Sequence, residues 1–367
     1  MAQYRVAIIG TGRPRREEGA TGFGMSHYHA AGYRASGECD LVALADISRA
    51  NAAVFRDEHG TADTRLYEDY RQMLAEAKPD VVSVCTWPAL HGEMVMAAAE
   101  AGVQAIHCEK PMAPTWGEAR RMRDACARHG TQLTFNHQRR FEAQYRTARR
   151  LIHDGAVGRV LQMQMACSNL YDWVTHWFDM LFFYNGETPA EWVLAQIDSR
   201  TDNTAFGVPL EDRGISLVGF QNDVRGLLIT GDQTRAGAAE GRAGGPGNPL
   251  GTAQRIIGTQ GMLEVGMGGG RLRLLGGAAT GFQDVPPDPA PTDTGGAIGA
   301  GIADLLRCLV TGEEPELSVN KAIRTTELIF ASYESSRRRA RVDLPLQIED
   351  SPFLAMLQRG EVGPPRV

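Results

Sequence analysis

The sequence has no run of apolar residues long enough to cross a bilayer, and its start, Met-Ala-Gln-Tyr-Arg, lacks the pattern of a signal peptide. Basic residues are not in excess either. The formal net charge is -6 and the pI is near 5.9, which argues against a nucleic-acid or anionic-membrane partner. The six cysteines are scattered, with no C-x-x-C pair and no zinc spacing. No helix carries a metal-ligand histidine pair with an acidic partner. We therefore predict a cytoplasmic protein that binds no nucleic acid, no membrane and no metal.

At 367 residues the chain is long enough for two domains with substantial cores. The first part alternates apolar strands with helices, which predicts a parallel sheet covered on both faces. The expected strands are 4–9, 41–45, 81–85, 103–108 and 131–135. The helices between them are expected near 24–33, 48–59, 67–75, 91–101 and 115–130, and a further helix is expected to run to about 153.

From Val160 onward apolar and polar residues alternate with period two, and the turn Gln221-Asn-Asp223 indicates a hairpin. This pattern predicts an open antiparallel sheet. Its expected strands are 160–167, 192–199, 214–221, 224–231, 253–258, 261–265, 271–275 and 342–346, with helices at 297–311 and 320–338. We place the domain boundary after residue 136, which gives domains 1–136 and 137–367.

A split glycine motif follows the first strand. Gly10-Thr-Gly12 stands where the phosphate-binding turn of a dinucleotide fold begins. Removing residues 13–21 restores G-x-G-x-x-G-x-x-H, with Gly24 as the third glycine at the start of a helix. An interrupted motif is weak evidence by itself, so it needs support from the next strand.

That support is Asp46, which ends the second strand about twenty residues beyond Gly24. A carboxylate there can accept both ribose hydroxyls of the adenosine and repels a 2′-phosphate, which favours NAD over NADP. Arg49 and the arginines of the insertion weaken this preference, so NADP remains possible. The alternative is that Asp46 caps the following helix.

Lys110, in Glu109-Lys110-Pro111, stands where an apolar run stops. Burial disfavours a charged lysine and lowers its pKa, and the proline restricts the backbone after it and permits a cis bond. The alternative is a strand-end lysine whose ammonium reaches water. Because Gly10, Asp46, Thr86 and Lys110 all fall at carboxyl ends of expected strands, we expect them to line one crevice.

A second constellation lies between residues 171 and 183. Asp172 and His176 are four residues apart, so on a helix they share a face and can hydrogen-bond. A carboxylate beside an imidazole fixes its tautomer and raises its basicity, as a general base requires. Asp179, three residues beyond His176, could reach the same face. The alternative is an amphipathic helix that packs its tryptophans and uses its aspartate as an N-cap.

With these motifs the chain resembles the Gfo/Idh/MocA family of glucose-fructose oxidoreductase, inositol 2-dehydrogenase and their relatives. The resemblance runs from Arg5 to about Leu346 and is most specific at Glu109-Lys110-Pro111, Thr86-x-Pro88-x-x-His91 and Asp172-x-x-x-His176. It implies a Rossmann domain followed by an α/β domain with a large, mostly antiparallel open sheet. That sheet often forms the oligomer interface, which implies a homodimer or homotetramer.

The resemblance also assigns roles. Lys110, Asp172 and His176 would be the catalytic set. The expected cofactor-binding residues are Gly10, Gly12, Gly24, Met25, Asp46, Ile47, Arg49, Thr86, Trp87, Pro88, His91, Glu109 and Lys110. The expected substrate-binding residues are Lys110, Arg139, Trp173 and His176.

Two departures from the family pattern affect these roles. The insertion splits the glycine motif, so Arg13, Arg15 or Arg16 could reach the cofactor or the substrate. Asn169-Leu-Tyr replaces the paired glycines that often precede the catalytic aspartate, so the backbone of the substrate pocket is expected to differ.

The function implied is hydride transfer between a nicotinamide and a secondary alcohol or ketone of a sugar, sugar derivative or cyclitol. His176 would be the base, held by Asp172, and Lys110 would bind the reacting oxygen. One alternative is an NAD-dependent glycosidase that acts by transient oxidation and elimination. The other is a non-catalytic sensor that binds the dinucleotide.

Overall fold

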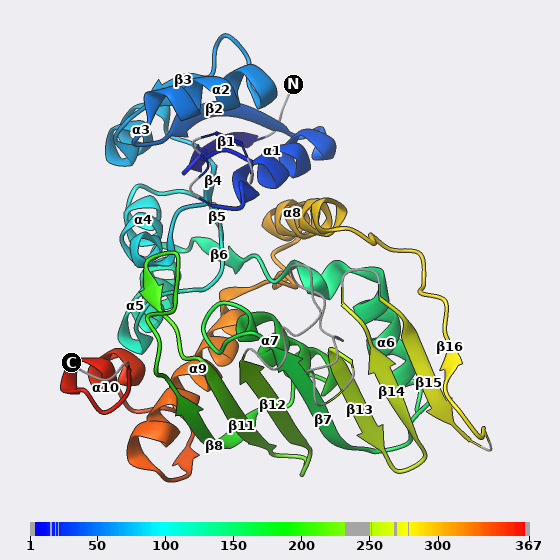
Figure 1. Ribbon diagram of the computed structural model, residues 1–367. Helices are drawn as coiled ribbons and strands as arrows, with labels where there is room; N and C mark the ends of the chain where they lie inside the picture. Colours follow the sequence, from blue (N-terminus) through cyan, green and yellow to red (C-terminus); the bar gives the residue numbers. More distant parts are fainter. Residues whose placement is uncertain are drawn as a thin grey trace. The chain divides into compact units, whose positions relative to one another are not determined.

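The computed structural model (Figure 1) describes residues 4–14, 17–18, 20, 22–231, 250, 252–267, 270–277 and 279–363. The chain forms two compact units. The first consists of Met1–Gln138 and Thr294–Ile323, and the second of Arg139–Asp293 and Arg324–Val367. Each unit has its own sheet.

The sheet of the first unit is six-stranded and parallel, with strand order β3-β2-β1-β4-β5-β6. This is the order of a dinucleotide-binding sheet, in which the strand order reverses between β1 and β4. The predicted strands are confirmed, while the short β3 was not predicted. The bounds are β1 (Tyr4–Ile9), β2 (Cys39–Ala45), β3 (Arg65–Tyr67), β4 (Val81–Val84), β5 (Ala105–Cys108) and β6 (Gln132–Phe135).

Helices alternate with these strands, and their ends follow the capping residues of the sequence. The side chains of Ser48, Asp69 and Thr115 each accept a backbone N–H in the first turn of the helix that follows. Gly130 ends a helix in the left-handed conformation. The helices are α1 (Met25–Ser36), α2 (Arg49–His59), α3 (Tyr70–Ala77), α4 (Pro88–Glu100) and α5 (Trp116–His129).

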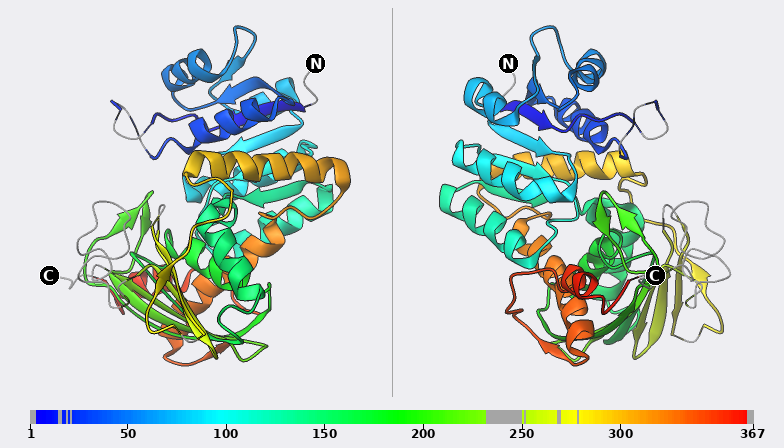
Figure 2. Two further views of the ribbon diagram at one scale, coloured as in Figure 1. Left: turned by 90° about the vertical axis from the view of Figure 1, so that its right-hand side faces the viewer. Right: turned by 60° about the vertical axis from the view of Figure 1, so that its left-hand side comes forward.

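One later helix, α8 (Thr294–Thr311), belongs to the first unit, although the sequence placed all of 137–367 in the second domain. It lies beside α1 (Figure 2), where Gly32 and Gly299 allow the two backbones to approach closely. Ile298 and Ile302 join the core that contains Val6. An apolar helix face shows that a helix is buried, but it does not say against which sheet.

The sheet of the second unit has nine strands in the order β16-β15-β14-β13-β7-β12-β11-β8-β17. It is mostly antiparallel, as predicted, and the hairpin at 221–223 joins β11 to β12. One pair differs from the prediction, because β7 and β12 run parallel. The bounds are β7 (Val160–Cys167), β8 (Ala190–Asp198), β11 (Arg213–Phe220), β12 (Arg225–Gly231), β13 (Gln254–Gly258), β14 (Gly261–Val265), β15 (Leu272–Gly276), β16 (Gln283–Asp284) and β17 (Val342–Asp343).

Helices of the second unit cover one face of this sheet (Figure 2). Ser335 and Ser336 of α9 accept hydrogen bonds from backbone N–H groups of β8, and Trp177 of α7 donates to Ala166 of β7. The helices are η1 (Gln138–Phe141), α6 (Ala143–His153), α7 (Val174–Tyr184), α9 (Val319–Arg338) and α10 (Pro352–Arg359), and a short ribbon is formed by β9 (Thr204–Ala205) and β10 (Val208–Pro209). Among the described residues, no helix has the length and apolar character of a membrane span.

Candidate functional site

In the first unit, the carboxyl ends of neighbouring strands are aligned by backbone hydrogen bonds. Gly10 N donates to Ala45 O at 2.8 Å, and Glu109 N donates to Val84 O at 2.9 Å. The residues that follow β1, β2, β4 and β5 therefore meet at one edge of the sheet, where parallel sheets bind ligands.

The glycine turn is closed despite the insertion. Gly10 has φ +84°, and a Cβ there would lie 2.8 Å from Cys85 O. Gly24 has φ +66° and stands at the N-terminus of α1, against the Cα of Pro14. The two ends of the insertion therefore lie close together. The turn can still bring its backbone N–H groups close to a phosphate. Met25 begins α1 and is half-buried.

The described part of the insertion is tied to α2. Arg13 Nε donates to Asn51 Oδ1 at 2.9 Å, and Arg13 also donates to Glu18 O at 2.7 Å. Arg13 is therefore engaged with protein groups. Arg15 and Arg16 lie outside the described residues.

Asp46 is bonded to the glycine turn. Its Oδ2 accepts hydrogen bonds from Thr11 N, Thr11 Oγ1 and Gly12 N at 2.9, 2.7 and 3.0 Å, and its Oδ1 accepts one from Ser48 N. Ser48, not Asp46, is the N-cap of α2. The alternative that Asp46 caps this helix is therefore wrong, and Oδ1 keeps capacity for a further donor.

The two residues after this carboxylate are open to solvent. Ile47 is 96% exposed, which is unusual for a large apolar side chain, and Arg49 is exposed at the start of α2. Arg49 also lines a polar hollow with Arg56 and Arg65 beside β3.

The segment after β4 approaches the glycine turn directly. The methyl group of Thr86 lies 2.8 Å from the position that a Cβ on Gly10 would take. Trp87 is 46% exposed and is the N-cap of α4, and Pro88 follows it. His91 is buried, with Nε2 3.0 Å from Thr86 O and Nδ1 2.9 Å from Pro111 O. In this position His91 holds two turns together instead of presenting its ring at the surface.

Glu109 and Lys110 follow β5. The Glu109 carboxylate is buried and accepts hydrogen bonds from Asn136 Nδ2 at 2.6 Å and Lys110 N at 3.2 Å, while His29 Nε2 lies 3.0 Å away. Burial opposes its ionisation, but His29, Lys110 and Asn136 offset that effect and lower the pKa of Glu109 to about 2. Lys110 is half-buried, and its bond to Pro111 is cis.

A buried chain of polar groups continues behind Glu109. His29 Nδ1 lies 3.0 Å from Ser83 Oγ, which lies 2.9 Å from Tyr33 Oη. The chain joins α1 to β4 and β5 and fixes the carboxylate beside Lys110. Sequence reasoning assigned no role to His29, although it stands on the helix that Gly24 opens.

In the second unit, α7 begins at Val174, so Asp172 lies in the preceding turn and His176 in the first turn of the helix. Both side chains are buried. Every residue of α7 is buried, so the helix is not amphipathic, and its N-cap is Trp173 rather than an aspartate. The alternative interpretation is therefore wrong about the amphipathic pattern and the aspartate cap, while its expectation that Trp177 is packed is confirmed.

Asp179 forms a buried ion pair. Its two oxygens accept hydrogen bonds from Arg140 Nε at 2.7 Å and Nη2 at 2.8 Å, and both side chains are 1% exposed. Arg140 also donates to Glu187. This ion pair neither requires nor excludes a contact with His176, so the proximity of Asp179 to His176 stays a prediction.

Two of the expected substrate-binding residues lie together. The Arg139 guanidinium is 5.8 Å from the Trp173 ring centroid and 4.8 Å from that of Trp177. Arg139 also donates to Tyr145 Oη at 3.1 Å. The arginine is thus held on aromatic faces next to the turn that carries Asp172.

That turn is held by residues that the sequence did not identify. Asn169 Oδ1 accepts hydrogen bonds from Asp172 N at 2.7 Å and Trp173 N at 3.1 Å. The buried Glu211 accepts from Leu170 N at 2.5 Å and from Tyr333 Oη at 2.7 Å. The Asn169 side chain therefore stabilises this turn, at the place where the family often has paired glycines. No sequence signal pointed to Glu211.

Together, the parallel sheet with its reversal of strand order and the closed glycine turn define a dinucleotide-binding fold. Residues 4–137 match the GFO_IDH_MocA model, described as an oxidoreductase family with an NAD-binding Rossmann fold. The resemblance to the Gfo/Idh/MocA oxidoreductase family is therefore confirmed over these residues.

Three relatives show where the similarity lies. D-apiose dehydrogenase of Paraburkholderia graminis is 27% identical over 98% of this chain and 95% of its own length. D-glucoside 3-dehydrogenase of Escherichia coli is 33% identical over 42% of this chain and 41% of its own. Inositol 2-dehydrogenase of Agrobacterium fabrum is 30% identical over 45% and 46%, respectively.

Solved structures share the fold over nearly the whole chain. A levoglucosan dehydrogenase in complex with NADH and levoglucosan has a TM-score of 0.78 at 20% identity, covering 93% of this chain and 99% of that one. An Agrobacterium radiobacter oxidoreductase in complex with NAD+, L-tartaric acid and magnesium has a TM-score of 0.74, also at 20% identity, covering 93% and 98%. The predicted two-domain fold is confirmed.

Proposed function

We propose that this protein is an NAD-dependent dehydrogenase that transfers a hydride between the nicotinamide and a secondary alcohol or ketone of a sugar, sugar derivative or cyclitol. The observation that carries the proposal is the half-buried Lys110 at the carboxyl end of β5, the strand next to β4, where the strand order reverses. The related dehydrogenases act on carbohydrates or a cyclitol by name, which supports the substrate class.

The residues of the first unit fit the dinucleotide. The turn at Gly10 and Gly12 and the N-terminus of α1 at Gly24 offer backbone N–H groups to a pyrophosphate. Asp46 would accept a ribose hydroxyl, and the exposed Ile47 would cover the adenine. Met25, Arg49, Thr86, Trp87 and Pro88 remain proposed contacts, and Asp46 favours NAD over NADP.

When bound, NAD supplies the hydride acceptor; the chain supplies the proton chemistry. We propose that His176 removes the hydroxyl proton and that Asp172 stabilises the imidazolium that forms. The Lys110 ammonium would donate a hydrogen bond to the same oxygen and stabilise its developing negative charge. Arg139 and Trp173 would bind the substrate, since a flat aromatic face suits a sugar ring.

Replacing Lys110 tests this proposal most directly. Lys110→Ala should leave NAD binding largely intact, because the side chain acts on the substrate oxygen, and should lower turnover by about 10²–10⁴-fold. Substrate is first found by a thermal-shift screen of polyols and aldoses with NAD and NADP, and turnover is then followed as NADH formation. Lys321→Ala, which removes a lysine paired with Glu316, is the control.

Near-normal turnover of Lys110→Ala would show that the assigned mechanism is wrong. Glycoside cleavage that requires NAD but produces no net NADH would instead indicate the glycosidase alternative. Dinucleotide binding without turnover of any screened compound, in the wild-type protein, would indicate the sensor.

We further propose that the protein is a homodimer or homotetramer through the face of the nine-stranded sheet opposite its helices. Leu194 and Ile215 on this face are 46% and 49% exposed, and Leu217 lies between Leu194 and Leu227 in register. A row of apolar side chains across three strands is a typical interface feature. The six free cysteines favour a reducing compartment, and we propose the cytoplasm.

The oligomer is tested by measuring mass in solution with light scattering. Leu194→Lys combined with Ile215→Lys should reduce the particle mass, because two charges would be buried in the interface. Leu161→Lys, at a residue 39% exposed near the end of β7, is the control. An unchanged mass of the double variant would place the interface elsewhere.

A further inference from the structure

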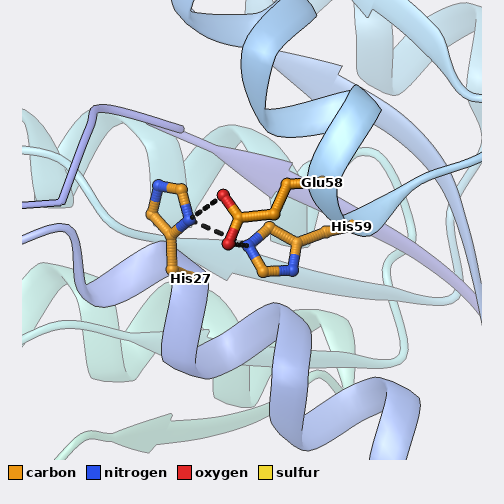
Figure 3. A group of neighbouring side chains, drawn as sticks. All are labelled: His27, Glu58 and His59. Carbon is orange, nitrogen blue, oxygen red and sulfur yellow. Dashed lines mark hydrogen bonds and ion pairs between the residues drawn. The ribbon is translucent and has the colours of Figure 1, made fainter.

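Three potential metal ligands from two helices converge in the first unit (Figure 3). His27 lies in the first turn of α1, and Glu58 and His59 are the last two residues of α2. His27 Nδ1 is 2.8 Å from His59 Nε2 and 3.2 Å from Glu58 Oε2, and His59 Nε2 is 3.3 Å from Glu58 Oε1. All ligand atoms lie within 4.8 Å of one another.

The sequence could not indicate this group. The prediction of no metal rested on the lack of a ligand pair within one helix, whereas His27 and His59 are 32 residues apart and meet only through the packing of α1 and α2. Both imidazoles are enclosed. Their side chains are 11% and 6% exposed, and the ring of Phe55 contacts both.

A hydrogen-bonded arrangement uses only part of this geometry. If both facing nitrogens donate to Glu58, two N–H groups oppose each other across 2.8 Å. If one nitrogen donates to the other, the carboxylate loses one of its two donors. A divalent cation would accept all three lone pairs at once.

The imidazoles also favour the form that binds metals. Burial lowers the pKa of His27 and of His59, against the raising effect of Glu58. Glu17 opposes the shift at His27, while His27 and Arg34 add to it at His59. Burial therefore favours the neutral imidazole, which is the form that ligates metals.

We propose that His27, Glu58 and His59 form a binding site for a divalent cation of the zinc type. Two imidazole nitrogens and one carboxylate form a donor set that Zn²⁺ prefers, and such sets complete a tetrahedron with a fourth ligand. Glu58 is 54% exposed, which leaves a path for entry.

The site would stabilise the nucleotide-binding part of the first unit without entering the hydride chemistry. It joins α1, which Gly24 opens, to α2, which follows Asp46.

Zinc binding to the full-length protein is the direct test. The protein is stripped with a chelator, the chelator is removed, and Zn²⁺ is titrated in a competition assay with a chromophoric indicator. The expected result is one tight equivalent per chain in the wild type and a higher melting temperature with Zn²⁺. His59→Gln should lose more affinity than the about 10–100-fold that an outer-sphere change costs. His129→Gln, at an exposed histidine of α5, should bind as the wild type does.

Two measurements keep the outcomes distinct. The metal-free melting temperature of His59→Gln should match that of the stripped wild type, which shows that the variant is folded. Glu58→Gln changes an exposed side chain and should weaken binding without unfolding the chain. If the wild type binds no tight equivalent, or if His59→Gln and Glu58→Gln bind Zn²⁺ as the wild type does, the site does not exist and the histidines form only a hydrogen-bonded pair.

Discussion

The two units hold their candidate functional residues in different ways. In the first unit, Asp46 and Lys110 directly follow strands, so the register of the parallel sheet brings them to one edge. In the second unit, Asp172 lies in a turn held by Asn169, three residues before it, and by the more distant Glu211. The first arrangement can be derived from the chain order, while the second depends on long-range contacts.

The contacts that hold the turn of the second unit join residues that are far apart in the sequence. Leu170 and Glu211, which are bonded, are 41 residues apart, and Glu211 and its partner Tyr333 are 122 apart. A parallel βαβ unit places strand ends by a general rule, whereas no rule places a buried glutamate under a turn. We therefore expect substitutions at the strand ends of the first unit to act through a backbone contact. Substitutions around the Asp172 turn of the second unit should act through side-chain hydrogen bonds.

The largest effect is expected at the glycine turn. Gly10→Ala should lower the free energy of unfolding by about 2–4 kcal/mol, because a positive φ and a close contact with Cys85 O combine. Gly12→Ala is the matched control, since Gly12 has φ +55° but no atom within 4 Å of an added Cβ. It should cost about 1–2 kcal/mol. Chemical denaturation without NAD measures both, and equal costs would mean that close approach is unimportant.

An intermediate effect with a pH signature is expected at Glu211. Burial raises the pKa of Glu211 to about 7, and hydrogen bonds from Tyr333 and Leu170 offset only part of this shift. The folded protein therefore binds a proton more tightly than the unfolded chain, so this stabilisation is complete below about pH 4.5 and is lost as the pH rises to about 7. The loss amounts to up to about 3 kcal/mol.

Glu211→Gln removes this titration while keeping a group that can bond to Leu170 N and Tyr333. The variant should be more stable than the wild type at pH 8, and the decline in stability between about pH 4.5 and 7 should be smaller. Denaturation at a series of pH values measures this, with Glu191→Gln at an exposed position as the control. An unchanged pH profile would contradict the assignment of the titration to Glu211.

The smallest effect on stability is expected at Asn169. Asn169→Ala removes the acceptor for Asp172 N and Trp173 N and should cost about 1 kcal/mol. Because the turn carries Asp172, kcat should fall more than KM rises, which a purely structural loss would not produce. Asn169→Asp retains an acceptor and should restore kcat. A variant with Ala that keeps the wild-type kcat would show that the turn does not position the aspartate.

The same contrast explains how much of the fold could be predicted from the sequence. Strands with continuous apolar runs were predicted correctly, because burial on both faces marks them. The parallel pairing of β7 with β12 was missed, since period two gives a strand its faces but not the direction of its neighbour. The short β3, β16 and the pair β9–β10 have too few residues to show any period.

At the candidate site, motif spacing predicted which residues stand at the strand ends, and the roles of Lys110, Asp172 and His176 stay predictions. Helical spacing could not reveal that Asp179 pairs with the buried Arg140, which lies 39 residues away in the sequence. The hydrogen bonds of Asp46 could not be predicted from the sequence either. Its position was right, but its bonds to Thr11 and Gly12 depend on the closed shape of the glycine turn.

The membership of α8 in the first unit has a consequence for how this protein can be divided. The chain passes between the units three times, after Gln138, Asp293 and Ile323. A fragment that stopped at Gln138 would contain the segment that matches the family model, yet Val6 and Tyr33 would lose the helix that covers them. Each unit is therefore built from two separate stretches of the sequence. Neither unit corresponds to one continuous segment that could be expressed or exchanged by itself.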